Sequence, residues 1–330
     1  MKRLLIIAAV LLLPTVIVAG AVGWHLVMQR FDAPGPLAAD TDVVIPRGSG
    51  LEEIGRMLEE AGVLADDRVF WLVVRVSDRA RRLKAGEFRF PAAVSMRGAL
   101  EILERGDVVV HSLTFPEGIR STEIAALLNE AEGLTGEISE VPPEGSVLPE
   151  TYHFVLEDSR SDLLARMTKA RDDLLAELWP KRAEDLPIQN PEEAVVLASI
   201  VEKETAVGDE RPLIAGVFIN RLRKGMRLQS DPTVIYGITQ GDGDLGRPLT
   251  RKDLSNGTPY NTYTIDGLPP GPIANPGRAS LEAVLNPAET DYLFFVADGT
   301  GGHAFAKTLD EHNRNVAKWR KLQRQNRNTE

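Results

Sequence analysis

The chain has 330 residues, of which 43% are hydrophobic and 26% are charged, so it is long enough for two or three compact units. Its formal net charge of −10 argues against a nucleic-acid partner, because such proteins need a basic surface to displace counterions. The absence of cysteine excludes disulfides and thiol catalysis, and none of the five histidines has a helical metal-site spacing. We therefore expect no metal and no cofactor.

Residues 1–29 predict a membrane anchor. Lys2 and Arg3 precede an apolar run over residues 4–27 that contains no Asp, Glu, Lys or Arg, and a bilayer core needs about 20 such residues. Positive charge before the run favours a cytoplasmic start, which would place the rest of the chain in the periplasm as a single-pass inner-membrane protein. A cleaved signal peptide is the alternative, since Ala19-Gly20-Ala21 resembles a cleavage site, although signal cores are usually shorter.

A short linker and a first compact module are expected next. The linker covers residues 30–40, and the module covers residues 41–113. The expected elements are a strand at 43–45, helices at 51–61 and 68–77, a strand at 87–90, a helix at 95–105 capped by Ser95, and a strand at 108–113. Strand, helix, helix and strand thus form the centre of this module.

Residues 114–185 predict a second small α/β subdomain with a connecting helix. Residues 112–118 weakly repeat the strand and Pro-x-Gly pattern of residues 44–48, and chance similarity is the alternative. Ser121 opens a helix that ends near residue 129, residues 132–150 form a loop, and residues 161–178 form an amphipathic helix.

Residues 186–330 predict a mixed α+β catalytic domain, so the whole chain is assigned to the α+β class. Asn190 and Pro191 give a strong helix start, and the helix that follows is apolar nearly all round, which indicates a buried central helix. The other expected elements are a helix at 213–222, a rigid Pro/Gly loop at 268–277, strands at 292–296 and 303–306, and a last helix opened by a capping box at 308–311.

Two acids, Glu202 and Glu204, end the central helix. Glu204 continues the apolar stripe of residues 197, 200 and 201, whereas Glu202 continues a stripe of smaller and partly polar residues. Desolvation raises the pKa of a carboxyl group, and a general acid needs a raised pKa at neutral pH. Glu204 is therefore the candidate acid and Glu202 a possible second acid. The alternative is a helix end that turns both acids into water.

Polar and aromatic residues after this helix suggest sugar recognition, which uses amide and hydroxyl hydrogen bonds together with aromatic faces. The candidates are Gln229, Asp231, Tyr260, Asn261, Tyr263 and His303. Each has a structural alternative: Asp231 could cap a short helix, the two tyrosines could pack in the interior, and His303 could be an ordinary hairpin residue.

Five segments resemble the YceG-like family of endolytic murein transglycosylases. They are LASIVEKETA at 197–206, VFINRL at 217–222, GMRLQSDPTVIYG at 225–237, YNTY at 260–263 and GLPPGPI at 267–273. The resemblance extends from the anchor to the C-terminus and is most specific from about residue 193 to residue 312. It implies a LysM-like βααβ module in residues 41–113 and places the catalytic glutamate on Glu204, whose Glu-Thr pair also resembles the Glu-Ser signature of other lytic transglycosylases.

The resemblance also implies a reaction. Glycan strands of peptidoglycan would be cut internally at the β-1,4 bond between N-acetylmuramic acid and N-acetylglucosamine, which leaves a 1,6-anhydro end. The sugar's own C6 hydroxyl is the nucleophile, so Glu204 alone serves as acid and then as base. Implied partners are glycan strands and cell-wall synthases. Two alternatives stay open: a muramidase-type hydrolase with Asp231 as base, and a non-enzymatic membrane-tethered peptidoglycan-binding protein.

Overall fold

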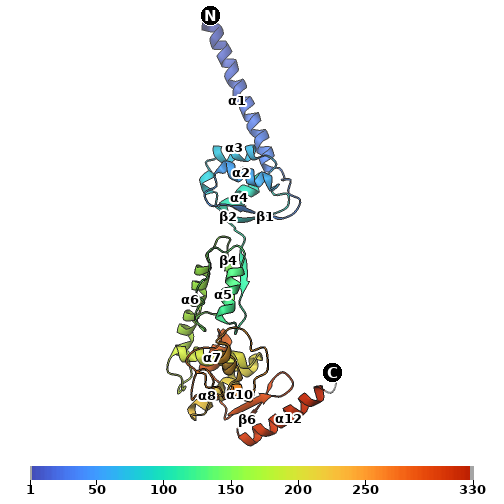
Figure 1. The fold of residues 1–330 in the computed structure, drawn as a ribbon. Helices are drawn as coiled ribbons and strands as arrows, with labels where there is room; N and C mark the ends of the chain where they lie inside the picture. The colour runs from blue at the N-terminus through green and yellow to red at the C-terminus, as the bar shows by residue number, and fades with distance from the viewer. Residues whose placement is uncertain (1, 328–330) are drawn as a thin grey trace. The chain divides into compact units, whose positions relative to one another are not determined.

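The computed structural model describes residues 2–327 as a mixed α+β protein with two compact units, Met1–His111 and Ser112–Glu330 (Figure 1). Each unit has a hydrophobic core of its own, and the second unit has two. The expected α+β class is therefore confirmed.

The first unit begins with a long helix, α1 (Lys2–Asp32), which contains Pro14. Residues Leu12–Asp32 are apolar and long enough to cross a membrane, and side chains 12–26 are exposed. A membrane span and a signal sequence share these properties. Met1 lies outside the described residues, and the side chains of Lys2 and Arg3, on which the expected orientation depends, are not described either.

A two-stranded antiparallel sheet and three helices build the first unit's core. Val43 lies opposite Phe88 in the sheet, and the buried side chains of both strands alternate toward the helices. The elements are β1 (Thr41–Ile45), α2 (Leu51–Glu60), α3 (Asp67–Val76), the 3₁₀ helix η1 (Ala80–Arg82), β2 (Gly86–Phe90) and α4 (Met96–Arg105). The expected strand, helix, helix, strand order is confirmed, and the Ser95 hydroxyl accepts a hydrogen bond from the amide of Gly98.

The segment expected to be a short linker packs on this unit. Leu37 is buried, and the amide of Gly35 donates to the carbonyl oxygens of Ala93 and Val94. A side chain at Gly35 would meet the Val94 oxygen at 2.2 Å, so this close backbone approach requires glycine. Residues 33–40 have no helix or strand, in agreement with their Pro and Gly content, but they are part of the fold.

The strand expected at 108–113 is wrong in its bounds. Val108 forms only an isolated bridge with Phe88, and the strand β3 is His111–Thr114. It pairs with β4 (Thr151–Phe154), a strand that the sequence did not predict. Four residues give too little alternation to indicate a strand, so this pairing depends on tertiary contacts.

The smaller core of the second unit lies between the β3–β4 sheet and two helices, α5 (Ser121–Glu130) and α6 (Arg160–Leu178). Phe115, Phe154 and Met167 are among its buried members. The hydroxyl of Ser159 caps α6 by accepting from the amide of Asp162. Both helices lie where the sequence predicts them.

The larger core surrounds α7 (Pro191–Glu204), which is buried at every residue from Ala194 to Val201. Asn190 caps this helix, since its side-chain oxygen accepts from the amide of Glu193 at 2.9 Å. The 3₁₀ helix η2 (Trp179–Lys181), which precedes α7 in the chain, also contributes to this core. So do two helices that follow α7, α8 (Arg211–Arg223) and α11 (Arg278–Leu285). The buried central helix is confirmed, whereas α11 was not predicted.

The remaining elements of the second unit follow α7 in the chain. They are the 3₁₀ helix η3 (Gly208–Glu210), α9 (Asp231–Thr239), α10 (Arg251–Leu254), β5 (Phe294–Ala297), β6 (His303–Ala306) and α12 (Leu309–Arg327). β5 and β6 form the expected hairpin. The predicted capping box opens α12, because the Thr308 hydroxyl accepts from the Glu311 amide at 3.2 Å.

Candidate active site

Glu204 is the last residue of α7, and its carboxyl group faces a cleft of ≈ 410 Å³. The chain leaves the helix at Thr205, which has an extended conformation, and Glu204 is largely but not fully buried at the helix end. We name this space the Glu204 cleft. Its lining residues are Glu204, Arg221, Leu228, Gln229, Asp231, Tyr263, Phe294, Phe295, Val296, Leu309, His312 and Val316.

Burial raises the pKa of the Glu204 carboxyl group to about 7. The Ser230 hydroxyl donates to Glu204 Oε1 at 2.5 Å and opposes this rise, whereas the charge of Asp231 adds to it. Such a group carries a proton in a large fraction of molecules at neutral pH and can release it. This is the property of a general acid.

Ser230 is held in place by a buried pair of threonines. Its amide donates to Thr262 Oγ1 at 2.9 Å, and the hydroxyls of Thr233 and Thr262 lie 2.8 Å apart. The neighbouring Gln229 has a φ of +52°, which is uncommon for a residue other than glycine, and its amide donates to the Thr262 carbonyl oxygen. The loop is therefore fixed where it meets Glu204.

Tyr263 and Asp231 form a second polar pair in the cleft. The Tyr263 hydroxyl donates to Asp231 Oδ1 at 2.6 Å. Burial and this hydrogen bond raise the pKa of Tyr263 well above its usual range, so the phenol remains a neutral donor. Asp231 opens α9, but its side chain makes no cap hydrogen bond, and the N-cap position is Ser230.

Arg221 of α8 is a buried arginine that lines the Glu204 cleft and supports its loops through hydrogen bonds. Its guanidinium donates to the carbonyl oxygens of Leu293 at 2.6 Å and Leu228 at 2.7 Å, and lies 5.2 Å from the ring centre of Phe294. It therefore ties the loop before Ser230 to the strand β5. The sequence analysis missed Arg221, although its position on a nearly apolar helix was an available signal.

An apolar wall of the Glu204 cleft is formed by the β5–β6 hairpin and α12. The ring of His312 stacks on Phe294 with 5.3 Å between their centres. Its Nδ1 atom is buried without a hydrogen-bond partner in the part of the chain that the structure describes, and burial lowers the pKa of His312. This wall offers aromatic faces and one unpaired ring nitrogen. The sequence analysis did not predict either feature.

Tyr260 and Asn261 lie outside the Glu204 cleft. The Tyr260 ring packs on Tyr236 with 4.8 Å between centres. The side chain of Asn261 is fully buried; its amide donates to the carbonyl oxygen of Asn256, and its oxygen accepts from the amide of Tyr263 at 2.9 Å. Both residues thus shape the loop that presents Tyr263.

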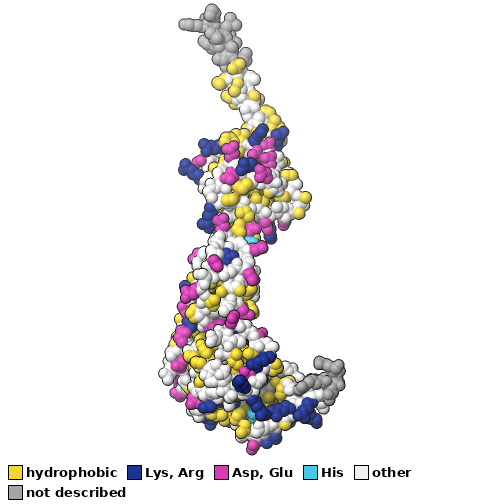
Figure 2. Space-filling model, in the orientation of Figure 1, with side chains coloured by type: hydrophobic (Ala, Val, Ile, Leu, Met, Phe, Trp, Pro, Cys, Tyr) yellow, Lys and Arg dark blue, Asp and Glu magenta, His cyan; other side chains and the backbone are white. Residues whose placement is uncertain are grey.

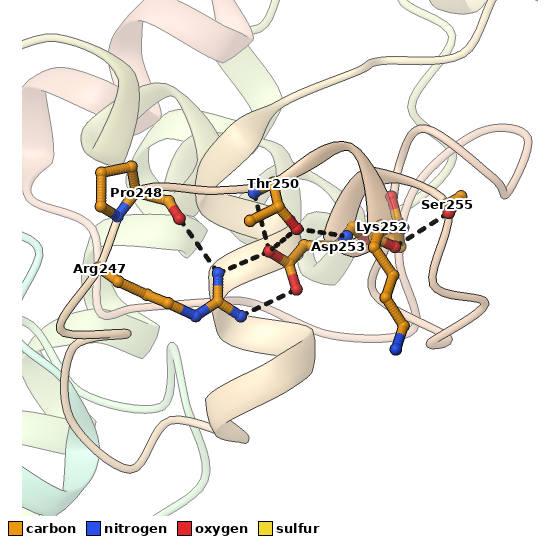
Figure 3. Close-up of polar contacts among 7 residues, drawn as sticks. Arg247, Pro248, Thr250, Lys252, Asp253 and Ser255 are labelled. Carbon is orange, nitrogen blue, oxygen red and sulfur yellow. Dashed lines mark hydrogen bonds and ion pairs between the residues drawn. The ribbon is translucent and has the colours of Figure 1, made fainter.

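The short helix α10 supports this loop in turn. Arg247 donates to both oxygens of Asp253, at 2.7 and 3.0 Å. Thr250 completes a capping box with the same carboxylate (Figure 3). These contacts hold the pKa of Asp253 far below its usual range. The carbonyl oxygen of Leu254 at the end of α10 accepts from the Asn261 side chain at 3.1 Å.

His303 lies near the Glu204 cleft, but its ring pairs with Glu210, which does not line that cleft. Its Nδ1 is 2.7 Å from Glu210 Oε2, and its amide donates to Glu210 Oε1 at 2.8 Å. The ring meets the edge of Phe295, a residue of the cleft wall, and a positive charge on this ring would lower the pKa of Glu204 against the effect of burial. His303 thus reaches the site through its neighbours.

Glu202 points away from the Glu204 cleft. Its Oε1 accepts from Arg211 at 3.2 Å, its Oε2 accepts from the amide of Gly277 at 2.9 Å, and 5% of its side chain is exposed. The alternative in which both acids turn into water is therefore wrong. A second cleft of ≈ 340 Å³, the Glu202 cleft, is lined by Glu117, Gly118, Glu202, Lys203, Glu204, Thr205, Ala206 and Arg211. Glu204 borders both clefts.

Within residues 2–327 no group of three or more His, Asp or Glu side chains is arranged to hold a metal ion. Several polar groups of the two clefts are instead paired with one another or with backbone, as Glu204 is with Ser230, Asp231 with Tyr263, and Glu202 with the Gly277 amide. The arrangement provides one proton-donating carboxyl group, a fixed hydroxyl, a neutral phenol and aromatic faces. It is suited to acid catalysis on a polar ligand that has apolar faces, such as a sugar.

Comparison with known proteins gives a consistent result. A profile of the YceG-like family matches residues 43–318. The endolytic murein transglycosylase of Bacillus subtilis is 30% identical over 84% of this chain and 84% of its own. That of Streptococcus pneumoniae is 30% identical over 83% of this chain, which spans 57% of the relative's length. A 2.6 Å crystal structure of a YceG-like protein from Listeria monocytogenes is 32% identical, with a TM-score of 0.50 over 84% of this chain and 99% of that one.

Proposed function

Because the chain belongs to the YceG-like family, we propose that it is a lytic transglycosylase that cleaves the glycan strands of peptidoglycan internally. The observation that carries the proposal is the carboxyl group of Glu204, whose pKa burial raises to about 7 at the floor of a cleft with polar and aromatic walls. A pure binding protein needs no such acid.

The bond proposed to break is the β-1,4 bond between N-acetylmuramic acid and N-acetylglucosamine. Protonated Glu204 gives its proton to the bridging oxygen, and the bond from this oxygen to C1 of the muramic acid breaks. The resulting carboxylate then takes the proton of the C6 hydroxyl as that oxygen attacks C1. The product is a 1,6-anhydro ring, no water is consumed, and Glu204 is protonated again.

One carboxyl group is sufficient for this sequence, whereas most glycosidases use two. Asp231 is the other acid of the Glu204 cleft, and it accepts a hydrogen bond from Tyr263. We assign Asp231, Tyr263 and Gln229 to sugar binding, because all three line the cleft. Tyr260, Asn261 and His303 are assigned an indirect role through the loop and wall that they support.

Internal cleavage requires space for sugar on both sides of the acid. Glu204 borders both the Glu204 cleft and the Glu202 cleft, and both lie within the second unit. A strand that occupied both clefts would pass Glu204 with sugar units on either side. This supports the proposal of an endolytic enzyme over one that acts at chain ends.

The proposal includes the location and the organisation of the chain. We propose that α1 is an uncleaved membrane span with a cytoplasmic start, so that both units lie in the periplasm. Residues 41–113 are proposed as a LysM-like module that binds peptidoglycan, 114–185 as a connecting subdomain, and 186–330 as the catalytic domain. Wall synthases are proposed as partners.

Digestion of purified sacculi by the full chain in detergent, followed by mass spectrometry, tests the proposal. We expect muropeptides lighter by one water than those of a muramidase, and none from the Glu204→Gln variant. Products with reducing ends would point to hydrolysis with Asp231 as base. Binding without any released product would point to a tethered scaffold.

A further inference from the structure

The segment that forms α3 and η1 is basic, although the chain as a whole is acidic. Residues 67–82, from the start of α3 to the end of η1, contain five arginines and two acids, Asp67 and Asp78, against a net charge of −10 for the chain. A basic amphipathic helix is typical of surfaces that contact membranes. None of the catalytic features described above uses this segment.

The helix α3 has two different faces. Val69, Phe70, Val73 and Val74 are buried in the core of the first unit. The exposed residues are Arg68, Trp71, Arg75 and Val76, with Trp71 41% and Val76 62% exposed. The outer face thus combines an aromatic ring and an aliphatic side chain with two arginines.

Four arginines of this region have side chains that are exposed at the surface of the first unit. The side chains of Arg68, Arg75, Arg81 and Arg82 are exposed and make no hydrogen bond or ion pair within the described residues 2–327, although the charge of Arg82 acts on Glu104. Arg79, by contrast, forms an ion pair with Glu104. We name Arg68, Trp71, Arg75, Val76, Arg81 and Arg82 the α3 surface.

The end of α1 is fixed directly beside α3. The Phe31 ring stacks on Phe70 of α3 with 6.5 Å between centres, and Phe31 is fully buried. Arg97 lies over the same Phe31 ring at 5.5 Å and pairs with Asp32 at 2.6 Å. The anchor helix therefore ends inside the core of the first unit and not in a flexible tether.

This joint places α3 at the end of the first unit from which α1 extends, while the β1–β2 sheet lies at the opposite end (Figure 1). Basic side chains flank the end of α1 on this unit, with acidic side chains between them (Figure 2). In α1, Gln29 and Arg30 are exposed, and so is the continuous run of side chains from Leu12 to Leu26. Five residues of helix from there to Phe31 span about 8 Å, which is the depth of the headgroup layer.

We propose that the α3 surface rests on the anionic headgroups of the membrane that α1 crosses, an inference that depends on the anchoring role proposed for α1. Trp71 takes the interfacial position that tryptophan favours, and the arginine stems lie along the apolar boundary with their guanidinium groups toward lipid phosphate. Each arginine near such a surface favours the docked state about fivefold. The first unit is thereby held flat on the membrane.

The test uses the full chain in vesicles of phosphatidylcholine and phosphatidylglycerol that contain a headgroup nitroxide lipid. Because the chain has no cysteine, single variants can carry one fluorescent label. Val76→Cys reports on the α3 surface, and Val44→Cys on β1, 43% exposed, is the matched control at the other end of the unit. We expect strong quenching at position 76 and little at position 44. Equal quenching at both positions would overturn the proposal.

Two further measurements test which interaction holds the α3 surface at the membrane. Replacing Arg68, Arg75, Arg81 and Arg82 by Gln should reduce the quenching at position 76, and each single replacement should lower the docked-to-undocked ratio about fivefold. Unchanged quenching in the fourfold variant would contradict a role of the anionic lipid. Extraction with alkaline carbonate separates the two proposals: release of the chain overturns the anchor as well, whereas retention without quenching overturns the α3 surface alone.

Discussion

The two acids at the end of α7 are two residues apart and occupy different environments. Glu202 faces the Glu202 cleft, where both its oxygens are engaged, one by the Arg211 guanidinium and one by the Gly277 amide. Glu204 faces the Glu204 cleft, where a single hydroxyl, that of Ser230, donates to it. The carboxyl group of Glu202 therefore has a structural role, whereas that of Glu204 is available to a ligand.

The comparison shows that environment, not residue type, separates a structural acid from a reactive one. A carboxylate that is paired with a cation and a backbone amide has both oxygens held by the surrounding protein, so it is less available to a substrate. A carboxyl group that is buried beside few donors holds its proton to a higher pH. Substitution of each acid should therefore affect a different property of the protein.

The largest effect is expected from Glu204→Gln. Glutamine keeps the shape and can accept from Ser230, but it cannot deliver a proton. Strand cleavage should fall by about 10²–10⁴ in kcat/KM, because that is the usual contribution of general acid–base catalysis. The measurement is release of muropeptides from sacculi, with circular dichroism as a control for folding. Full activity in a folded variant would remove Glu204 from the mechanism.

The same substitution should stabilise the protein at alkaline pH. The carboxyl pKa is 4.5 ordinarily and about 7 in the fold, so the folded state binds more protons between these values. The stability present below pH 4.5 is then lost as the pH rises through about 7. Glu204→Gln should be more stable than the parent by about 1–3 kcal/mol at alkaline pH and equal to it in acid.

Thermal unfolding in detergent at both pH values measures this difference. The Glu202→Gln variant is the matched control, since it replaces the neighbouring acid. A stability gain for Glu204→Gln of the same size in acid and in alkali would show that the gain does not come from the titration of this carboxyl group.

Glu202→Gln should act on stability and leave the chemistry intact. The change removes a buried charge opposite Arg211, which keeps only Glu117, at 3.4 Å, as a partner. A loss of about 1–3 kcal/mol in unfolding free energy is expected, with kcat near that of the parent. A loss of cleavage without a loss of stability would instead transfer the catalytic role to Glu202.

The smallest effect separates the tyrosines inside and outside the Glu204 cleft. Tyr263→Phe removes the hydrogen bond to Asp231 and should reduce kcat/KM by about five- to tenfold, which corresponds to one hydrogen bond of about 1 kcal/mol. Tyr260→Phe should have little effect, because its ring packs on Tyr236. The reverse order, measured on the same sacculi, would place Tyr260 at the substrate.

Local signals explain which parts of the fold were predictable. The start of α7 is encoded by Asn190 and Pro191, and the capping box of α12 by Thr308 and Glu311, so each was found from a few adjacent residues. The strand β4 and the helix α11 were missed, since segments of four and eight residues carry too little periodicity.

The candidate site was predictable in part for the same reason. Helical spacing alone places Glu204 on the apolar stripe of α7, and this position agrees with its raised pKa. The loop at 260–263 has no such period, so the sequence could not tell that Tyr263 faces the cleft while Asn261 is buried. His312 has no local signal of this kind, whereas the place of Arg221 on the nearly apolar helix α8 was a signal that the sequence did offer.

The sequence by itself determined the helix, its cap and the side of the helix on which Glu204 lies, because each of these depends on residues within a few positions of one another. Only the tertiary structure decided what surrounds the carboxyl group. Ser230 is 26 residues away, and the wall formed by Phe294 and His312 lies still further along the chain. Desolvation is the sum of all neighbours in space, so the acidity of Glu204 is a property of the folded chain.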